Sequence, residues 1–153
     1  MEFFHGPTIA FKDMALQILP HLLTTSAKKN GVENDIVILT ATSGDTGKAA
    51  LAGFAGVEGT KIVVFYPDGG VSPIQEKQMV TQKGDNTHVV AIKGNFDEAQ
   101  TGVKNIFNNK ELAKEMDEKD SSSHQPTLLT LEDLFRRLHT MFILTLNYWR
   151  KVR

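Results

Sequence analysis

The sequence predicts an α/β protein with three layers, in which helices cover both faces of a parallel sheet built from βαβ units. Three apolar, β-branched runs begin about 25 residues apart, and the stretches between them have helical spacing. This rhythm is typical of parallel strands that are joined by crossover helices. The chain has 153 residues, which is enough for one domain with a hydrophobic core.

The composition is ordinary for a globular protein, with 41% hydrophobic and 23% charged residues. The net charge is −1, so charge indicates neither a nucleic-acid partner nor a membrane surface. There is no cysteine, so we expect neither a disulfide framework nor a thiolate metal site. No apolar run is long enough to span a bilayer. We therefore expect a cytoplasmic protein without a metal site.

Residues 13–29 predict the first helix, which is amphipathic. Its apolar positions at helical spacing are Ala15, Ile18, Leu19, Leu22 and Leu23. Pro20 is expected to kink or split this helix, because proline has no backbone N–H and crowds the preceding turn. The Asn30-Gly31 pair is a stop signal for the helix.

Three runs predict strands of the sheet. Residues 35–41 and 60–66 predict buried strands, and residues 88–92 predict a third strand. Three further stretches predict helices: residues 46–56, 73–83 and 96–116. Ser72 is a candidate N-cap, and Pro73 suits a first-turn position. The apolar side of the last helix is formed by Phe96, Ala99, Val103, Ile106 and Phe107.

The segment ATSGDTGKAA, residues 41–50, follows a predicted strand and opens a helix. Its turn consists of Ser43, Gly44, Asp45, Thr46 and Gly47. Free N–H groups at the start of a helix favour an anion, and the hydroxyl groups of this turn add donors. Carboxyl ends of parallel strands are where open α/β sheets bind ligands. The segment therefore predicts a carboxylate or phosphate site, although a plain turn with an N-cap explains it equally well.

Lys12 lies at the start of the first helix, in the segment HGPTIAFKD, directly after Ala10 and Phe11. An exposed surface lysine is the simpler interpretation, but the helix dipole disfavours a positive charge at this end. Apolar neighbours and the dipole both favour the neutral amine, which is the nucleophilic form. Lys12 is therefore a candidate nucleophile.

Four segments carry a resemblance to a known family. They are FFHGPTIAFKDMALQ, ILTATSGDTGKAALAGFAG, KIVVFYPDGGVSPIQEKQMVTQ and HVVAIKGNFDEAQTGVKNIF. In this order they closely resemble the threonine synthase family, which is dependent on pyridoxal phosphate (PLP) and has the tryptophan-synthase-β-like fold. The resemblance runs from residue 2 to about residue 119.

The resemblance implies that Lys12 forms a Schiff base with PLP and shuttles protons. It implies that Phe11 and Asp45 lie beside the cofactor, and that the loop from Ser43 to Gly47 holds the substrate carboxylate. The implied reaction converts O-phosphohomoserine and water to threonine and phosphate, with PLP as the electron sink.

Two parts of the family pattern are not found: the segment before HGPT, and a later glycine-rich loop that grips the PLP phosphate. We therefore expect a fragment, with residues 1–120 as a partial enzyme domain whose own activity the sequence does not decide. Two alternatives remain. One is a threonine dehydratase-like PLP lyase, against which HGPTIAFKD and YPDGGVSPIQ both argue. The other is a non-catalytic α/β phosphate-binding module, in which Lys12 is dispensable.

Residues 121–153 differ in character and do not continue the βαβ rhythm. We interpret this tail as aberrant and, from about residue 123, as the product of a frameshift; the alternative is a divergent natural tail. If the third base of each codon is read with the first two of the next, the tail can encode SANSINIGRLFPQIAYYVYSYAELLEKG, which is similar to the family. In its present frame, residues 130–149 predict a helix.

Overall fold

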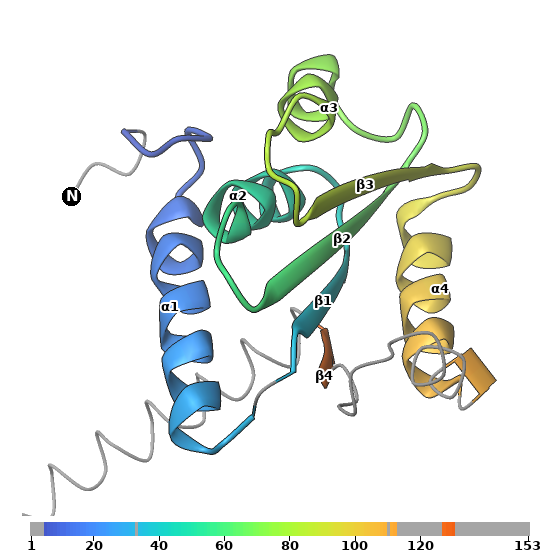
Figure 1. Cartoon of the computed structure of the whole chain (residues 1–153). Helices are drawn as coiled ribbons and strands as arrows, with labels where there is room; N and C mark the ends of the chain where they lie inside the picture. The colour runs from blue at the N-terminus through green and yellow to red at the C-terminus, as the bar shows by residue number, and fades with distance from the viewer. Residues whose placement is uncertain (1–4, 33, 110, 113–126, 131–153) are drawn as a thin grey trace, which may run out of the picture.

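The computed structural model describes residues 5–32, 34–109, 111–112 and 127–130. Along the chain the elements are α1 (Asp13–Lys29), β1 (Ile36–Ala41), α2 (Asp45–Phe54), β2 (Thr60–Pro67), α3 (Pro73–Val80), β3 (Thr87–Ile92), α4 (Phe96–Asn108) and β4 (Thr127–Thr130). Helices lie on both sides of a sheet (Figure 1). The predicted three-layer α/β fold with a parallel sheet is confirmed.

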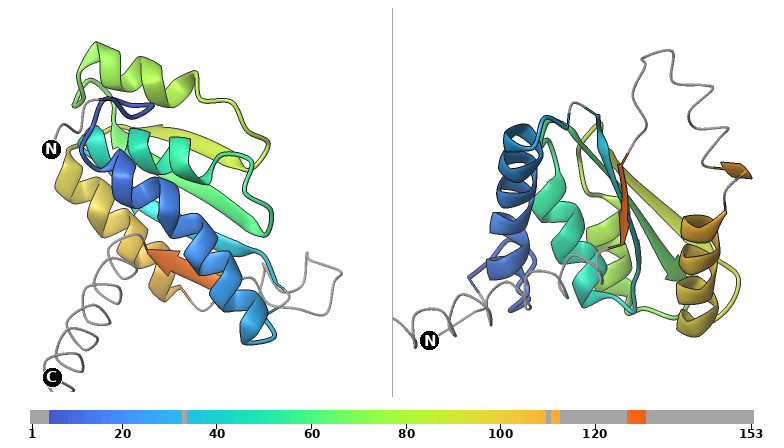
Figure 2. Two further views of the ribbon diagram at one scale, coloured as in Figure 1. Left: turned by 90° about the vertical axis from the view of Figure 1, so that its left-hand side faces the viewer. Right: turned by 90° about the horizontal axis from the view of Figure 1, so that it is seen from below.

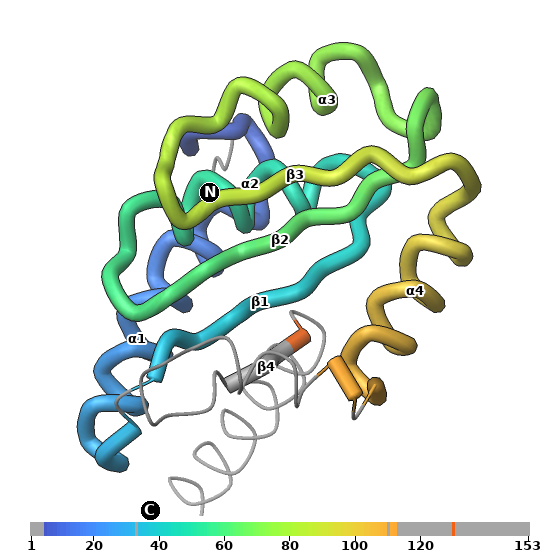
Figure 3. The backbone as a smooth tube through the Cα atoms, turned by 45° about the vertical axis from the view of Figure 1, so that its right-hand side comes forward, coloured from blue at the N-terminus to red at the C-terminus, as the bar shows by residue number. Residues whose placement is uncertain are grey.

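The sheet has the order β3-β2-β1-β4, and every neighbouring pair is parallel (Figure 3). Three strands were predicted from the sequence, and the short β4 adds a fourth beside β1. The chain proceeds from β1 outward to β3 and then returns to the other side of β1, so the strand order reverses there. Ligand sites in open α/β sheets lie at the carboxyl ends of the strands beside such a reversal. The loop that follows β1 occupies this position.

Each face of the sheet has its own core. On one face Ile36, Ile38, Ile62 and Val64 pack with α1, α2 and Met79 of α3. On the other face, Val37 and Leu39 pack with Val103 of α4. Figure 2 shows the sheet between α1 and α2 on one side and α4 on the other. Because successive strand residues point to opposite faces, β1 must be apolar at nearly every position to serve both cores.

The buried face of α1 differs from the predicted one. Leu16, Leu19 and Pro20 are buried, whereas Ile18 and Leu22 remain 61% and 52% exposed. The helix has apolar residues around most of its circumference, so its sequence is compatible with more than one buried face. Contact with α2 selects the face that includes the proline. α1 also continues through Pro20 as one helix, so the expected split is wrong.

Pro20 and Gly53 allow α1 and α2 to approach closely. Proline has no N–H to donate to the carbonyl of Leu16, one turn earlier. That carbonyl lies against Gly53 of α2, where an added Cβ atom would be only 2.2 Å from the oxygen. The two backbones therefore pack together at a point where no side chain fits.

Other element boundaries differ by a few residues from the prediction. α3 begins as expected, with Ser72 and Gln75 forming a capping box and Pro73 in the first turn, but it ends at Val80. α4 ends at Asn108, because Asn109 adopts an extended conformation. Residues 110 and 113–116 of the helix predicted over 96–116 lie outside the described residues. Phe107 is 40% exposed and does not join the core.

Most of the tail cannot be compared with its prediction. The predicted helix over residues 130–149 begins at Thr130, which is instead the last residue of β4, and residues 131–149 lie outside the described residues. From 121–153 only Thr127–Thr130 is described. Among the helices that are described, none is long and apolar enough to cross a membrane.

A methyl group at Gly53 should destabilise the protein. We expect Gly53→Ala to lower the free energy of unfolding by about 1–3 kcal/mol, because α1 and α2 must separate to admit it. The measurement is urea denaturation followed by circular dichroism. Gly102→Ala in α4 is the matched control, since in the described part of the chain nothing outside its own stretch of helix lies within 4 Å of its Cβ position. Gly102→Ala should raise the free energy of unfolding by up to about 1 kcal/mol, because alanine has a higher helix propensity than glycine. Equal effects of the two substitutions would contradict the close approach.

Candidate functional site

Lys12 and the loop after β1 meet at the carboxyl edge of the sheet. The amine Nζ of Lys12 donates a hydrogen bond of 2.6 Å to Oγ1 of Thr46, in the first turn of α2. Lys12 is the N-cap residue of α1 and is half-buried. It is thus not a free surface lysine, because its amine is held against the predicted anion loop, 34 residues further along the chain.

The segment that carries Lys12 is folded by the carboxylate of Asp13. Asp13 is buried and accepts hydrogen bonds from the backbone N–H and the hydroxyl group of Thr8, at 2.9 and 2.5 Å. Gly6 lies against the same carboxylate, because a Cβ atom there would be 2.3 Å from it. These contacts bend residues 6–12 over the start of α1. The direction of Lys12 therefore depends on residues that surround it in the HGPTIAFKD segment.

The loop after β1 is built around the hydroxyl group of Thr42. This group is buried and accepts from the backbone N–H of Gly44, at 3.0 Å, and of Gly47, at 2.8 Å. Gly44 has a φ of 133°, in the region that side chains rarely adopt. Gly47 packs on Thr42, since a Cβ atom there would lie 2.4 Å from its methyl group.

The prediction that this loop has free N–H groups is therefore only partly correct. Gly44 and Gly47 already donate to Thr42. Ser43, Asp45 and Thr46 have backbone N–H groups without a protein acceptor in the described part of the chain. Ser43 and Asp45 are exposed, and Thr46 is half-buried. An anion at this loop would be met by these three residues rather than by the glycines.

Asp45 is held by two positively polarised groups. Its Oδ1 atom accepts from the side-chain amide of Gln75, at 2.9 Å, and pairs with the ammonium of Lys48, at 3.0 Å. The hydrogen bond from Gln75, and then the one from Lys48, hold the pKa of the Asp45 carboxyl below its usual value. Lys48 is buried. The negative charge of Asp45 is therefore matched locally, so it opposes an anion at the loop less than a bare carboxylate would.

The structure brings together most of the predicted site residues. Lys12 contacts Thr46, which belongs to the loop from Ser43 to Gly47 and to the first turn of α2. Phe11 is 65% exposed, and the Lys12 amine lies 5.5 Å from the centre of its ring. The exposed side of Phe11 is free to contact a ligand.

Three residues of the site were missed by sequence reasoning: Thr8, Thr42 and Gln75. Thr42 ends an apolar, β-branched run and so resembles one more strand residue. The Ser72-to-Gln75 spacing signals a capping box, but it does not reveal that the Gln75 amide also reaches Asp45, 30 residues away.

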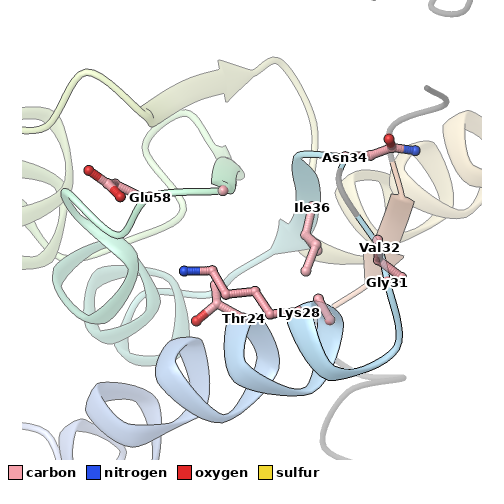
Figure 4. Close-up of a pocket in the computed structure, with 9 residues that line it drawn as sticks. Thr24, Lys28, Gly31, Val32, Asn34, Ile36 and Glu58 are labelled. Carbon is pink, nitrogen blue, oxygen red and sulfur yellow. The ribbon is translucent and has the colours of Figure 1, made fainter. Parts of the chain in front are cut away.

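A hollow of about 380 Å³ lies elsewhere, beside the last turns of α1 (Figure 4). Its lining includes Lys28, Ile36 and Glu58. These residues come from the end of α1 and from the amino ends of β1 and β2. The hollow is thus at the opposite edge of the sheet from Lys12 and is not part of the candidate site.

Comparison with known proteins gives consistent results. The chain is 49% identical to the threonine synthase of Pseudomonas aeruginosa over 107 residues, which are 70% of this chain and 22% of that protein. It is 43% identical over 118 residues to the threonine synthase of Saccharomyces cerevisiae, covering 73% of this chain and 23% of that protein. No family model matches the chain.

Solved structures show the same relationship. The PLP-bound threonine synthase of Brucella melitensis superposes with a TM-score of 0.71 at 38% identity, over 85% of this chain and 25% of that one. The Escherichia coli enzyme has a TM-score of 0.69 at 39% identity, over 87% of this chain and 28% of that one.

The shared chain course places the described residues within the α/β fold of PLP-dependent enzymes of fold type II. Within that class, the chain belongs to the threonine synthase family. It spans about a quarter of the length of the relatives that it matches.

Removal of the Thr42 hydroxyl group should disrupt the loop. We expect Thr42→Val to lower the free energy of unfolding by about 1–3 kcal/mol, because two buried N–H groups lose their acceptor. Thr40→Val in β1 is the control, since the Thr40 hydroxyl makes only a long 3.3 Å bond to the next carbonyl, and valine suits a strand. Chemical denaturation of both variants checks this, and comparable losses would contradict the role of Thr42.

Proposed function

We propose that this chain serves the threonine synthase reaction, the conversion of O-phosphohomoserine and water to threonine and phosphate. One observation of the structure supports this most strongly: the hydrogen bond that holds the Lys12 amine on Thr46 of the anion loop. It joins the two segments to which the family resemblance assigns the covalent lysine and the substrate carboxylate. Because the chain spans about a quarter of its relatives, the activity of this chain alone is part of the proposal.

The residues present fit the aldehyde end of PLP. An aldehyde cofactor requires a primary amine in a defined position, and Lys12 supplies one that is half-buried and directed by Thr46. Asp45 lies in the same loop and is kept ionised by Gln75 and Lys48. Lys12 would hold the cofactor covalently, with Phe11 and Asp45 beside it. When bound, PLP supplies an electron sink for carbanions of an amino-acid substrate.

The remaining tasks fall to the residues of this chain. The N–H groups of Asp45 and Thr46 and the hydroxyl group of Ser43 would bind the substrate carboxylate at the positive end of α2. The Thr46 hydroxyl accepts from Nζ of Lys12 and so directs the amine. Once the amine of the substrate has replaced Nζ on the cofactor, the released Nζ would accept and return the proton of the substrate carbon next to the carboxylate.

Covalent labelling tests this proposal. The purified chain is mixed with PLP, reduced with borohydride, digested and mapped by mass spectrometry. We expect a visible absorbance band before reduction and selective labelling of Lys12 after it, and loss of both in Lys12→Ala, because this amine is held on Thr46 whereas the nearby Lys48 amine is buried and paired with Asp45. Lys104→Ala, which changes an exposed lysine of α4, is the control and should label like the natural chain.

Label spread evenly over many lysines, or none at all, would contradict a cofactor site in this chain. It would favour the alternative of a non-catalytic α/β module, for which Lys12 is dispensable. If labelling is selective, production of phosphate from O-phosphohomoserine separates threonine synthesis from cofactor binding alone.

A further inference from the structure

Gln75 of α3 links two segments of the site that are distant in sequence. Its Oε1 atom accepts the backbone N–H of Ser72, at 3.1 Å, and its own N–H donates to the Ser72 hydroxyl. Its Nε2 atom donates to Oδ1 of Asp45, at 2.9 Å. One side chain therefore closes the start of α3 and reaches across to the first turn of α2.

The orientation of the Gln75 amide is determined by its partners. Because Ser72 offers an N–H, the oxygen of the amide must face Ser72, and the NH₂ group must face the Asp45 carboxylate. A flipped amide would lose both hydrogen bonds and set its oxygen against a carboxylate. The two hydrogen bonds together therefore require glutamine at position 75. Glutamate could also complete the capping box, but it has no N–H group to donate to Asp45.

The same side chain also lies over Gly44. A Cβ atom at Gly44 would be 2.4 Å from the amide carbon and oxygen of Gln75. Gly44 is the N-cap of α2, with a backbone conformation that side chains rarely adopt. Gln75 thus covers the positive-φ glycine of the loop and binds the residue next to it.

We propose that Gln75 is a positioning residue, whose amide holds Asp45 and Gly44 so that the loop from Ser43 to Gly47 keeps the shape that receives Lys12. This inference rests on the proposed function in assigning that loop to ligand binding. Gln75 itself touches Asp45 and Gly44, and it acts on the site through them. Lys48 holds the same Oδ1 atom from within α2, so Gln75 is the contact that comes from outside the loop and its helix.

Gln75→Glu isolates this contact. Glutamate can still accept from the Ser72 N–H, so the start of α3 is preserved. Its second oxygen would face the Asp45 carboxylate and repel it. Asp45→Asn in addition restores a donor–acceptor pair, because the new amide can donate to the glutamate. Gln82→Glu is the matched control, since it adds the same charge just after α3, where the Gln82 side-chain amide donates to the neighbouring carbonyl of Lys83.

Hydrogen exchange reports the loop directly, without any cofactor. The N–H groups of Gly44 and Gly47 are both donated to Thr42, so their exchange rates measure whether the loop is closed. We expect Gln75→Glu to raise both rates roughly tenfold. The double variant should return them close to the natural rates, and Gln82→Glu should leave them unchanged. Carbon NMR should also show the Asp45 pKa moving upward in Gln75→Glu.

Two outcomes would overturn the inference. One is exchange in Gln75→Glu that matches Gln82→Glu, or that stays fast in the double variant. The other is selective PLP labelling of Lys12 in Gln75→Glu that matches the labelling in Gln82→Glu, because a loop that has lost its shape should receive Lys12 less well. If the natural chain shows no selective Lys12 label, the proposed function fails, whereas the exchange cycle still decides whether Gln75 holds the loop.

Discussion

The hydrogen bond between Lys12 and Thr46 is the interaction on which the candidate site depends. It joins the starts of α1 and α2 at the carboxyl edge of the sheet, where the strand order reverses beside β1. Neither helix could supply the site alone: α1 brings an amine without an anion site, and α2 brings an anion loop without a nucleophile. The packing of Leu16 on Gly53 keeps the two helices close enough for this contact to form.

Around this contact, each segment is stabilised by its own polar group. Asp13 folds the segment before α1 by accepting two hydrogen bonds from Thr8. Thr42 folds the loop before α2 by accepting two from Gly44 and Gly47. Both acceptors are buried, and buried polar groups with satisfied hydrogen bonds tend to specify one conformation. The site is thus assembled from two rigid turns, and the sheet holds them side by side.

The sequence was most informative where one physical constraint dominates. A strand buried on both faces must be apolar throughout, so β1 and β2 were predicted to within a residue or so. The buried face of α1 was not, because its apolar residues extend around the helix and only contact with α2 selects among them. β4 was also missed, because a strand of four residues depends on the edge of β1 rather than on its own pattern. In the site, Lys12 and the loop were recognisable from local motifs. Gln75 was not, because its partner Asp45 is distant in sequence.

The most direct test of the central contact is a double-mutant cycle with Lys12→Met, Thr46→Val and the combined variant, measured by urea denaturation of the 153-residue chain. The cycle reports the coupling between the two side chains and not the separate cost of each substitution. We predict a favourable coupling free energy of about 1 kcal/mol, as for an ordinary hydrogen bond within a protein. Strictly additive effects, with a coupling of zero, would contradict the view that this contact joins the two halves of the site.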